Sequence, residues 1–395
     1  MEKRRKFDVF AVHSSLEAPG VPVPLSALVG ALSNAAGESQ DMHPVKWAWI
    51  CRYISQENWE QQYCLRLDVG QPKPGDIAMV EVEKLGHHHY LETDKARRLR
   101  LYKGDKLICA FGNRYATEAY EGRALDPNKN KLHLLSGSGM IGTVISRHRD
   151  IVRPTGLSFL GYLTDNTGTR INMRNLPHFQ PSDKATPKNV IVVAGTGMST
   201  GKTTVMRRVL HGLASRGVRV AGCKLTGTAS PRDLLEMRAT GALFTTDFSD
   251  YGFPSTYGVD MHELIGLFDR MTDACSRKGA DIIVMEVADG LLQRETGMIL
   301  KNDLLRHRIC GVLVASTCSG SALYATESLQ KTGQDVWAVS GLITNSPLFV
   351  REFKSNSSVP VASSRAGDQL TDIIMNKLEL RRIEKRPLEM SAKVQ

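Results

Sequence analysis

The chain has 395 residues, of which 42% are hydrophobic and 23% charged, with a formal net charge of +10. This length predicts two or three domains, and the composition is typical of a globular protein rather than a disordered one. No apolar run is long enough to cross a bilayer, and the basic start MEKRRKFDVF lacks the apolar core of a signal peptide. Seven cysteines without a Cys-x-x-Cys pair fit a reducing compartment, so we expect a cytoplasmic protein without a membrane partner.

The positive charge alone is weak evidence for a nucleic-acid partner, because it concerns non-specific binding. Part of the excess lies in EKRRK and ELRRIEKR, near the two ends of the chain. Such runs are more often solvated tails, and no zinc-finger or RNP-like motif accompanies them. We expect no nucleic-acid partner; an anionic small-molecule substrate also suits a basic protein.

Residues 1–174 are predicted to form a β-rich N-terminal domain, to which the sequence assigns no role. Short β-favouring runs such as GDIAMVEVEKLG and KLHLLSGSGMIGTVISRH alternate with turn residues, and 165–168 is a predicted hairpin turn. This spacing predicts a small barrel or sandwich of roughly 100 residues. Trp47, Trp49 and Trp59 either mark a binding surface or are buried, and burial is the simpler explanation.

Two local patterns in this half are not expected to be sites. GSGMIG, at 137–142, matches a dinucleotide-binding fingerprint, but a helix must follow such a motif and TVISRH is short and β-branched. The triple histidine at 87–89 has no cysteine or carboxylate partners at ligand spacing and is predicted to be an exposed turn. The loop GNRYATEAYEG, at 112–122, is assigned no role.

A polar, proline-rich linker is predicted at 175–188, and a nucleotide-binding domain at 189–395 with a basic C-terminal tail. The apolar β-branched run 190–193 predicts a buried strand, and 202–216 predicts a helix. Between them lies GTGMSTGKT, which resembles a phosphate-binding loop but has five residues between Gly195 and Gly201 where the strict pattern has four.

The chemistry of this segment favours a phosphate cradle over a chance Gly-Lys-Thr in a glycine-rich turn. Glycines let the backbone turn its N–H groups towards an anion, and the N-terminus of a helix carries free donors and positive partial charge. Lys202 is expected to reach the terminal phosphates, and the Thr203 hydroxyl to ligate Mg²⁺. The predicted nucleotide-binding residues of the loop are Gly195, Thr196, Gly197, Met198, Ser199, Thr200, Gly201, Lys202, Thr203 and Thr204.

The remaining C-terminal half alternates apolar strands with helices. Strands are predicted in GVRVAGCKLTGT, ADIIVMEVADG, ICGVLVASTCSGSA, VWAVSGLITNSP and VPVASS, with helices between them. This pattern predicts an α/β fold, a doubly wound, mainly parallel sheet of the P-loop NTPase type. Ligands bind at the carboxyl ends of such strands, which makes Lys224, Glu286 and Asn345 site candidates.

The C-terminal half resembles dethiobiotin synthetase over about 188–385. That family's loop, typically GTDTEVGKT, also has five residues between its glycines, a feature shared with cobyrinate amidase. RVAGCKLTG, IIVMEVADGLL and GLITNSP parallel further family segments, and the two lysines are 22 residues apart (224 − 202), as in the family. The resemblance implies ATP and Mg²⁺ as cofactors, a homodimer, Glu286 as a Mg²⁺ ligand and Asn345 as a base contact.

The substrate-facing residues depart from the family. Its Lys-Pro is Lys224 followed by leucine here, its Glu-Gly-Ala-Gly-Gly is EVADG, and it has no barrel-like N-terminal domain. Its mid-domain Mg²⁺-binding aspartate has no clear counterpart. Asp233 is our choice as a metal ligand because it opens a helix after a strand end, although it could equally be a helix N-terminal charge.

These residues predict ATP-dependent phosphoryl transfer, which depends on positioning and on neutralising phosphate charge. The predicted catalytic residues are Lys202, Lys224 and Glu286, and the predicted Mg²⁺ ligands are Thr203, Asp233 and Glu286. The resemblance implies that Lys224 orients a carboxylate or carbamate acceptor, which is phosphorylated and then captured by a nucleophile. The alternative for Lys224 is an ordinary surface lysine, and the alternative for Glu286 is a carboxylate with a structural role only.

A different class of function remains open. Nucleotide-dependent assembly factors, including the molybdopterin-guanine dinucleotide accessory proteins, use related loops, and in such a switch the β-domain would bind a protein partner. A ligase needs Lys224 for its acceptor, whereas a switch does not. The sequence does not distinguish ATP from GTP, and it does not name the acceptor.

Overall fold

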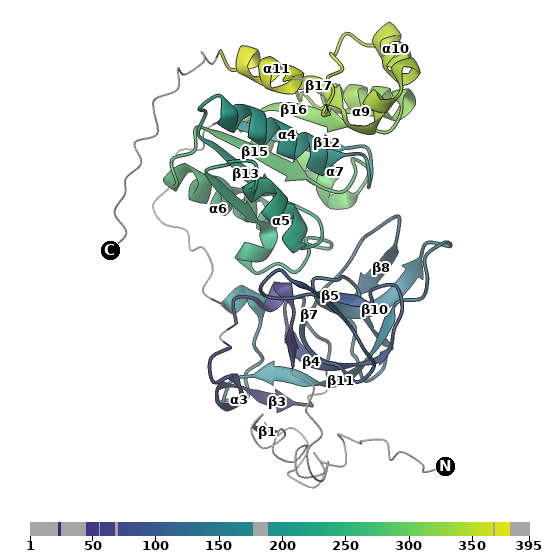
Figure 1. Ribbon diagram of the computed structural model, residues 1–395, viewed down its shortest axis with the longest axis vertical. Coiled ribbons are helices and arrows are strands. Elements are labelled where there is room, and N and C mark those ends of the chain that lie inside the picture. The colour runs from purple at the N-terminus through teal and green to yellow at the C-terminus, as the bar shows by residue number, and fades with distance from the viewer. Residues whose placement is uncertain are drawn as a thin grey trace. The chain divides into compact units, whose positions relative to one another are not determined.

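The computed structural model describes residues 23–24, 45–54, 56–67, 70–176, 189–365 and 368–379, and these form two compact units (Figure 1). Unit 1 holds the described residues up to 176 together with Gly227–Arg232 and Phe248–Gly258, and unit 2 holds the others. Most of the predicted linker, residues 177–188, lies outside the described residues.

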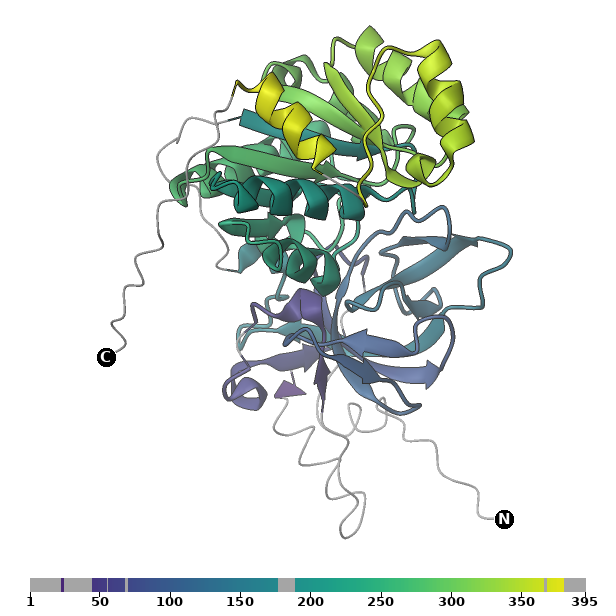
Figure 2. The same ribbon diagram turned by 45° about the horizontal axis from the view of Figure 1, so that its top comes forward.

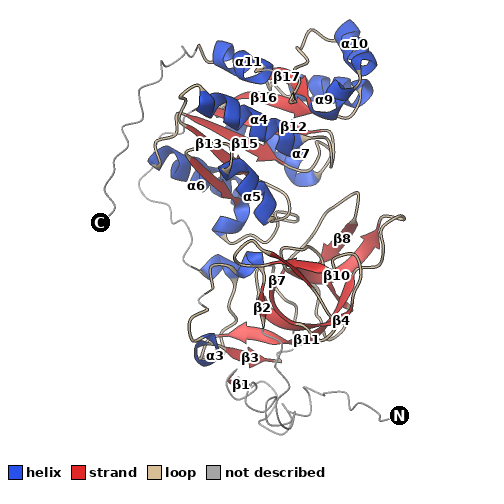
Figure 3. Cartoon of the chain, in the orientation of Figure 1, coloured by secondary structure: helices blue, strands red, loops and turns tan. Residues whose placement is uncertain are grey.

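Unit 1 is built mainly from short strands (Figure 3). Nine of them form one sheet: β1 (Val23–Pro24), β2 (Lys46–Trp47), β3 (Cys64–Arg66), β4 (Ile77–Lys84), β7 (Lys106–Phe111), β8 (Tyr120–Arg123), β9 (Leu132–Leu134), β10 (Met140–Arg147) and β11 (Thr155–Thr164). Strands β5 (Tyr90–Glu92) and β6 (Arg98–Arg100) form a separate hairpin. The short helices of this unit are η1 (Trp49–Cys51), α3 (Trp59–Gln62) and η2 (Met173–Asn175).

Five of these strands close on themselves as a small barrel. Strand β11 pairs with β4, β4 with β7, β7 with β10, β10 with β9, and β9 with β11 again. All these pairs are antiparallel except β7 with β10, which is parallel. The prediction of a β-rich domain is therefore confirmed, and of the two predicted architectures the barrel is the one that forms.

Several local predictions for this unit can be compared with the structure. Trp47 and Trp49 are buried, as the simpler explanation predicted, whereas Trp59 is partly exposed. The predicted hairpin turn follows β11, and the Gly168 amide donates to the carbonyl of Asp165 at 3.0 Å. GSGMIG leads into strand β10 and no helix follows, which confirms its rejection as a dinucleotide site. The histidine turn is only partly exposed, because His88 is bonded to the carbonyl of Leu135.

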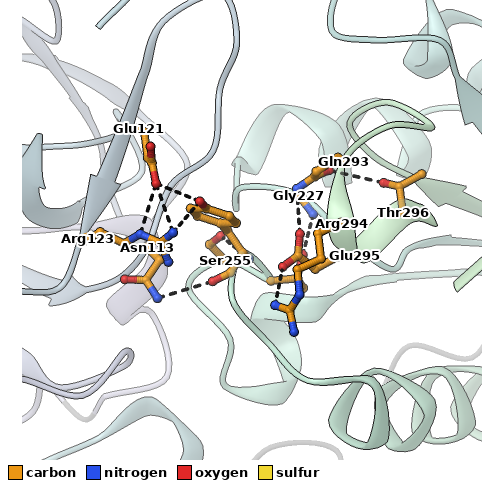
Figure 4. A network of polar contacts seen from close by, with 11 residues as sticks. Asn113, Glu121, Arg123, Gly227, Ser255, Gln293, Arg294, Glu295 and Thr296 are labelled. Atoms are coloured by element: carbon orange, nitrogen blue, oxygen red, sulfur yellow. Dashed lines mark hydrogen bonds and ion pairs between the residues drawn. The ribbon is translucent and has the colours of Figure 1, made fainter. Parts of the chain in front are cut away.

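The segment Phe248–Gly258 belongs to unit 1 because polar contacts tie it to the β-rich fold. The Asp250 carboxylate forms an ion pair with Arg52. The Tyr257 hydroxyl donates to Glu121 at 2.8 Å, within the network drawn in Figure 4. The sequence predicts this segment within the nucleotide-binding domain, whereas it belongs to unit 1. The domain boundaries at 174 and 189 stay a prediction.

Unit 2 contains a six-stranded sheet in which every neighbouring pair is parallel. Its order is β14 (Phe244–Asp247), β13 (Val220–Lys224), β15 (Ile282–Val287), β12 (Asn189–Gly195), β16 (Ile309–Ala315) and β17 (Val336–Ser340). Strands β12 and β15 are neighbours in one sheet, as predicted. The predicted strand in VPVASS is wrong: only a single parallel bridge forms there, between Val361 and Val339.

Helices cover both faces of this sheet. Every residue of β13 and β15 is buried although successive side chains point to opposite faces, so neither face is left to water. The helices are α4 (Lys202–Ser215), α5 (Pro231–Arg238), α6 (Met261–Arg277), α7 (Arg294–Lys301), α8 (Asp303–Arg306), α9 (Ser319–Lys331), α10 (Pro347–Asn356) and α11 (Gln369–Lys377), with the 3-10 turn η4 (Gly341–Asn345). A further 3-10 turn, η3 (Phe248–Tyr251), belongs to unit 1. The doubly wound parallel α/β fold is therefore as predicted.

Glycines set how closely some of these elements pack. In Figure 2 the teal helix α4 and the yellow helix α11 lie side by side. A Cβ on Gly212 of α4 would lie 2.0 Å from the Thr371 hydroxyl of α11, so only glycine permits this approach. Among the described helices, none has the length and apolarity needed to span a membrane.

The contact between β16 and β17 gives a test of this packing. A Cβ on Gly311 would lie 2.0 Å from the Trp337 ring, so Gly311→Ala should overpack the core and lower the free energy of unfolding by about 1–3 kcal/mol. Gly266→Ala is the matched control, because no atom lies within 4 Å of that position in helix α6, and it should raise stability by roughly 0.5–1 kcal/mol. Urea unfolding followed by circular dichroism measures both; equal effects would contradict the packing.

Candidate functional site

The glycine-rich loop joins β12 to α4 in unit 2. Strand β12 ends at Gly195 and α4 begins at Lys202, so the loop spans 196–201. Gly201 has φ +95°, a left-handed conformation that glycine adopts without strain. The Thr196 amide donates to the carbonyl of Ala315 at 3.0 Å, which ties the loop to the neighbouring strand β16.

Two main-chain segments pack closely on this loop. The Leu342 amide donates to the Thr200 carbonyl at 3.1 Å, and a Cβ on Gly341 would lie 2.3 Å from that same oxygen. From the other segment, a Cβ on Gly290 would lie 2.8 Å from the Cα of Gly197. The loop is therefore held by backbone contacts that only glycines at these positions allow.

Lys202 folds back over the loop. Its ammonium donates to the Gly197 carbonyl at 2.7 Å, and the residue is buried although it carries a charge. This places the cation above the loop, where the sequence predicts that it reaches the terminal phosphates. Thr203 follows it in the first turn of α4.

The second part of the site is a buried charge cluster at the end of two neighbouring strands. Lys224 ends β13 and stands in register with Glu286 of β15, and both are buried. The Lys224 ammonium also forms an ion pair with Asp233 at the start of α5. Charges are buried in this way only when opposite charges compensate them.

The pKa values of the two buried groups, Lys224 and Glu286, are both raised. Burial alone would lower the pKa of Lys224, but the carboxylates of Asp233 and Glu286 outweigh it and raise that pKa, so the lysine stays charged. Burial raises the pKa of Glu286 above its usual range, and the neighbouring Lys224 opposes this rise. A cation arriving beside Glu286 would favour its ionised form.

Most of the loop, together with Lys224 and Glu286 of the cluster, lines one cavity of about 380 Å³. The predicted residues Gly195, Thr196 and Gly197 are not part of its wall. Most of the predicted site residues lie on its wall: Met198, Ser199, Thr200, Gly201, Lys202, Thr203, Thr204, Lys224 and Glu286. Asn345 is exposed at the end of η4 and is not part of this wall. Asp233 is not part of it either, and its ion pair with Lys224 explains the position of its carboxylate without a metal ion.

Asp289 lines this cavity and was not chosen from the sequence. Its amide donates to the Gln293 side chain at 2.7 Å, and Gln293 in turn donates to the buried Glu295 at 3.2 Å (Figure 4). The available signal was a second carboxylate three residues after Glu286. The resembling family has glycine at this position.

The oxygen donors on the cavity wall fit Mg²⁺. This ion prefers hard oxygen ligands and is usually held by one or two carboxylates together with waters and substrate phosphates. Thr203, Glu286 and Asp289 supply a hydroxyl and two carboxylates to the same cavity. The part of the chain that the structure describes contains no cluster of three or more histidine, cysteine or carboxylate residues that could hold a metal by itself.

The parallel sheet, the glycine loop at the end of β12 and the lysine that opens α4 together define a P-loop NTPase fold. No family model matches the chain, and the comparison with curated proteins gives no match.

Among solved structures, the signal recognition particle receptor FtsY from Elizabethkingia anophelis in complex with GDP is 16% identical, with a TM-score of 0.33 over 53% of this chain and 69% of that one. Chloroplast FtsY from Physcomitrella patens is 14% identical, with a TM-score of 0.35 over 52% of this chain and 70% of that one. A LAO/AO transport system kinase is 14% identical, with a TM-score of 0.33 over 50% and 61%. At these TM-scores the likenesses are loose, and the fold follows from the topology and the loop.

Gly341 offers a test of the loop that leaves its own residues unchanged. Gly341→Ala would bring a Cβ against the Thr200 carbonyl and force a left-handed conformation on alanine, so the loop must shift. We expect nucleotide affinity to fall by about tenfold or more, as positioning losses of this kind do. Gly320→Ala, where no atom lies within 4 Å, should leave affinity unchanged. Titration with a fluorescent nucleotide measures both, and equal affinities would contradict the packing.

Glu286 offers a test of the metal ligands. Glu286→Gln keeps the shape of the side chain but removes an anionic oxygen ligand, so half-maximal turnover should require about tenfold more Mg²⁺. Asp281→Asn, an exposed carboxylate paired with Arg219 just before β15, is the control. A Mg²⁺ titration of nucleotide hydrolysis measures the shift, and an unchanged curve would mean that Glu286 is structural.

Proposed function

We propose that this protein is a Mg²⁺–ATP-dependent enzyme that phosphorylates a carboxylate or carbamate oxygen of a small acceptor. A nucleophile would then attack the carbonyl carbon of the resulting mixed anhydride and displace inorganic phosphate, in a ligation or a ring closure. The observation that carries the proposal is that Lys224 lines the same cavity as the glycine loop. A cation beside the phosphate loop is suited to hold an anionic acceptor.

The step proceeds by displacement at the γ-phosphorus. The acceptor oxygen supplies an electron pair to form the new P–O bond, the bond from the γ-phosphorus to the β,γ-bridging oxygen breaks, and ADP leaves with that electron pair. Positioning and charge neutralisation account for most of catalysis in such reactions. Lys202 would neutralise the transferring phosphoryl group, and Lys224 would orient the acceptor.

When bound, Mg²⁺ would supply positive charge that offsets the negative charge of the phosphates. Thr203 and Glu286 would hold it, with Asp289 as a further oxygen donor on the same wall. Asp233 is the weaker candidate because it already pairs with Lys224. We therefore assign Asp233 to the positioning of Lys224 rather than to the metal.

A second cavity in unit 2 gives room for the nucleoside. It has a volume of about 420 Å³ and shares Thr204 with the loop cavity. Arg208 of helix α4 stands in its wall and donates to the carbonyls of Ser364 and Arg365, at 3.1 and 2.6 Å. A triphosphate in the loop cavity would direct its nucleoside towards this wall, and the base contact predicted for Asn345 stays a prediction.

Lys224 separates an acceptor-using enzyme from a nucleotide switch. In Lys224→Met, ATP affinity should stay within a few-fold of the wild-type value, because Lys202 and the loop make the phosphate contacts. Product formation should fall by about 10²–10³-fold, as lost charge stabilisation does. Small carboxylates and diamines are screened for stimulated ADP release, and the stimulating compound is then tested with the variant. Lys202→Ala is the reference that should lose turnover altogether.

Two further variants protect this test from a folding defect. Removing Lys224 leaves the carboxylate of Asp233 without its counter-ion, which can cost about 3–5 kcal/mol of stability. Lys224→Met is therefore combined with Asp233→Asn, and the thermal unfolding of the double variant is measured. Lys224→Arg keeps the charge and should retain more product formation. Loss of ATP binding in the stable double variant would place Lys224 in the nucleotide site. Stimulation by a protein alone would favour the switch.

A further inference from the structure

Unit 1 contains its own cavity, with a volume of about 490 Å³. It shares no lining residue with either of the cavities described in unit 2. Its wall is formed by the histidine turn 87–89, the β5–β6 hairpin, the loop that carries Arg114, the turn 136–138 and the segment Gly227–Arg232. Its volume lies within the range of small-molecule sites.

Arg114 is the fixed charge of this wall. Its guanidinium donates to the Leu135 carbonyl, lies 2.9 Å from the His88 imidazole nitrogen, and stacks over the Tyr120 ring at 4.9 Å. These contacts hold the side chain in one orientation, and a guanidinium remains charged at any physiological pH. A preorganised cation of this kind binds a carboxylate or phosphate at little cost in side-chain entropy.

His87 and His88 add hydrogen-bond donors and acceptors without adding charge. Burial, which is the largest cause, and the charge of Arg114, which is the next largest, lower the pKa of His88 to about 3, so this imidazole is neutral at pH 7. Burial also lowers the pKa of His87. The fixed positive charge of the wall therefore comes from arginines, and the imidazoles of His87 and His88 serve as neutral polar groups.

The remaining wall is polar and mostly positive. Arg98, which stacks on the Tyr90 ring at 4.2 Å, and Arg232 are exposed arginines at its edge. With Arg114 they outnumber the single lining carboxylate, Glu92, by three to one. Ser136 adds a buried hydroxyl, held 2.7 Å from that of its neighbour Ser138. Arginine, hydroxyl and imidazole groups around one cavity are the donors that oxyanions require.

We propose that this cavity binds a small organic anion through a carboxylate or phosphate group, with Arg114 as its anchor and the exposed Arg98 and Arg232 as further contacts at the edge. The site is separate from the phosphate loop and does not depend on the proposed function. Glu92 would accept from a hydroxyl or amine elsewhere on the ligand. The loop at 112–122 then has a role, because it supplies the anchoring arginine.

The test is a calorimetric titration of the full-length protein with citrate and, separately, with inorganic phosphate. It is carried out in the Lys202→Ala background with a chelator present, so that the phosphate loop and metal ions contribute little. We expect saturable binding of at least one probe, and the tighter probe identifies the group that is recognised. Glycerol, a polyol without charge, should not bind. Absence of saturable binding for both anions would overturn the proposal.

Variants then locate the binding. Arg114→Gln should weaken the binding of the probe by about tenfold or more, as the loss of a charge-assisted hydrogen bond does. Arg149→Gln, an exposed arginine of unit 1 outside this wall, is the matched control and should leave binding unchanged. If Arg114→Gln lowers the melting temperature, the double variant Arg98→Gln with Arg232→Gln removes two exposed charges and should weaken binding by a similar factor. Equal affinity in all these variants would exclude the cavity as the site.

Discussion

A buried lysine held between two carboxylates constrains the catalytic end of the sheet in unit 2. Lys224, Glu286 and Asp233 come from two strands and a helix, and each charge is tolerated only because the others compensate it. The cluster therefore requires β13 and β15 to be neighbours in parallel register and α5 to start where it does. The same requirement places a charged amine and a carboxylate on the wall of the loop cavity.

The loop itself depends on a second constraint, which is the close approach of main-chain segments. Gly290 and Gly341 press on the loop so closely that neither position has room for a side chain. Backbone contacts of this kind hold the loop rigid, which suits a site whose amides must meet phosphate oxygens without rearrangement. The close backbone packing and the buried charges thus act on the same cavity.

Local sequence patterns were sufficient for much of the fold. The strand before the loop, the helix after it and the alternation of apolar strands with helices all depend on periodicity and glycine placement, which neighbouring residues determine. Lys224 and Glu286 could be selected because ligands in parallel sheets bind at the carboxyl ends of strands. The same pattern predicts a strand around Val361, where only a single bridge forms, because an apolar run does not show whether a partner strand lies within reach.

The amino-acid sequence by itself determined the order of the elements, the glycine loop and the charged residues that could meet at one end of a sheet. Only the tertiary structure decided that Asp233 pairs with Lys224, that Asp289 lines the loop cavity, and that Phe248–Gly258 belongs to unit 1. It also decided that Arg114 and His88 meet in one cavity. These contacts join residues distant in the chain, and their geometry follows from packing rather than from local propensity.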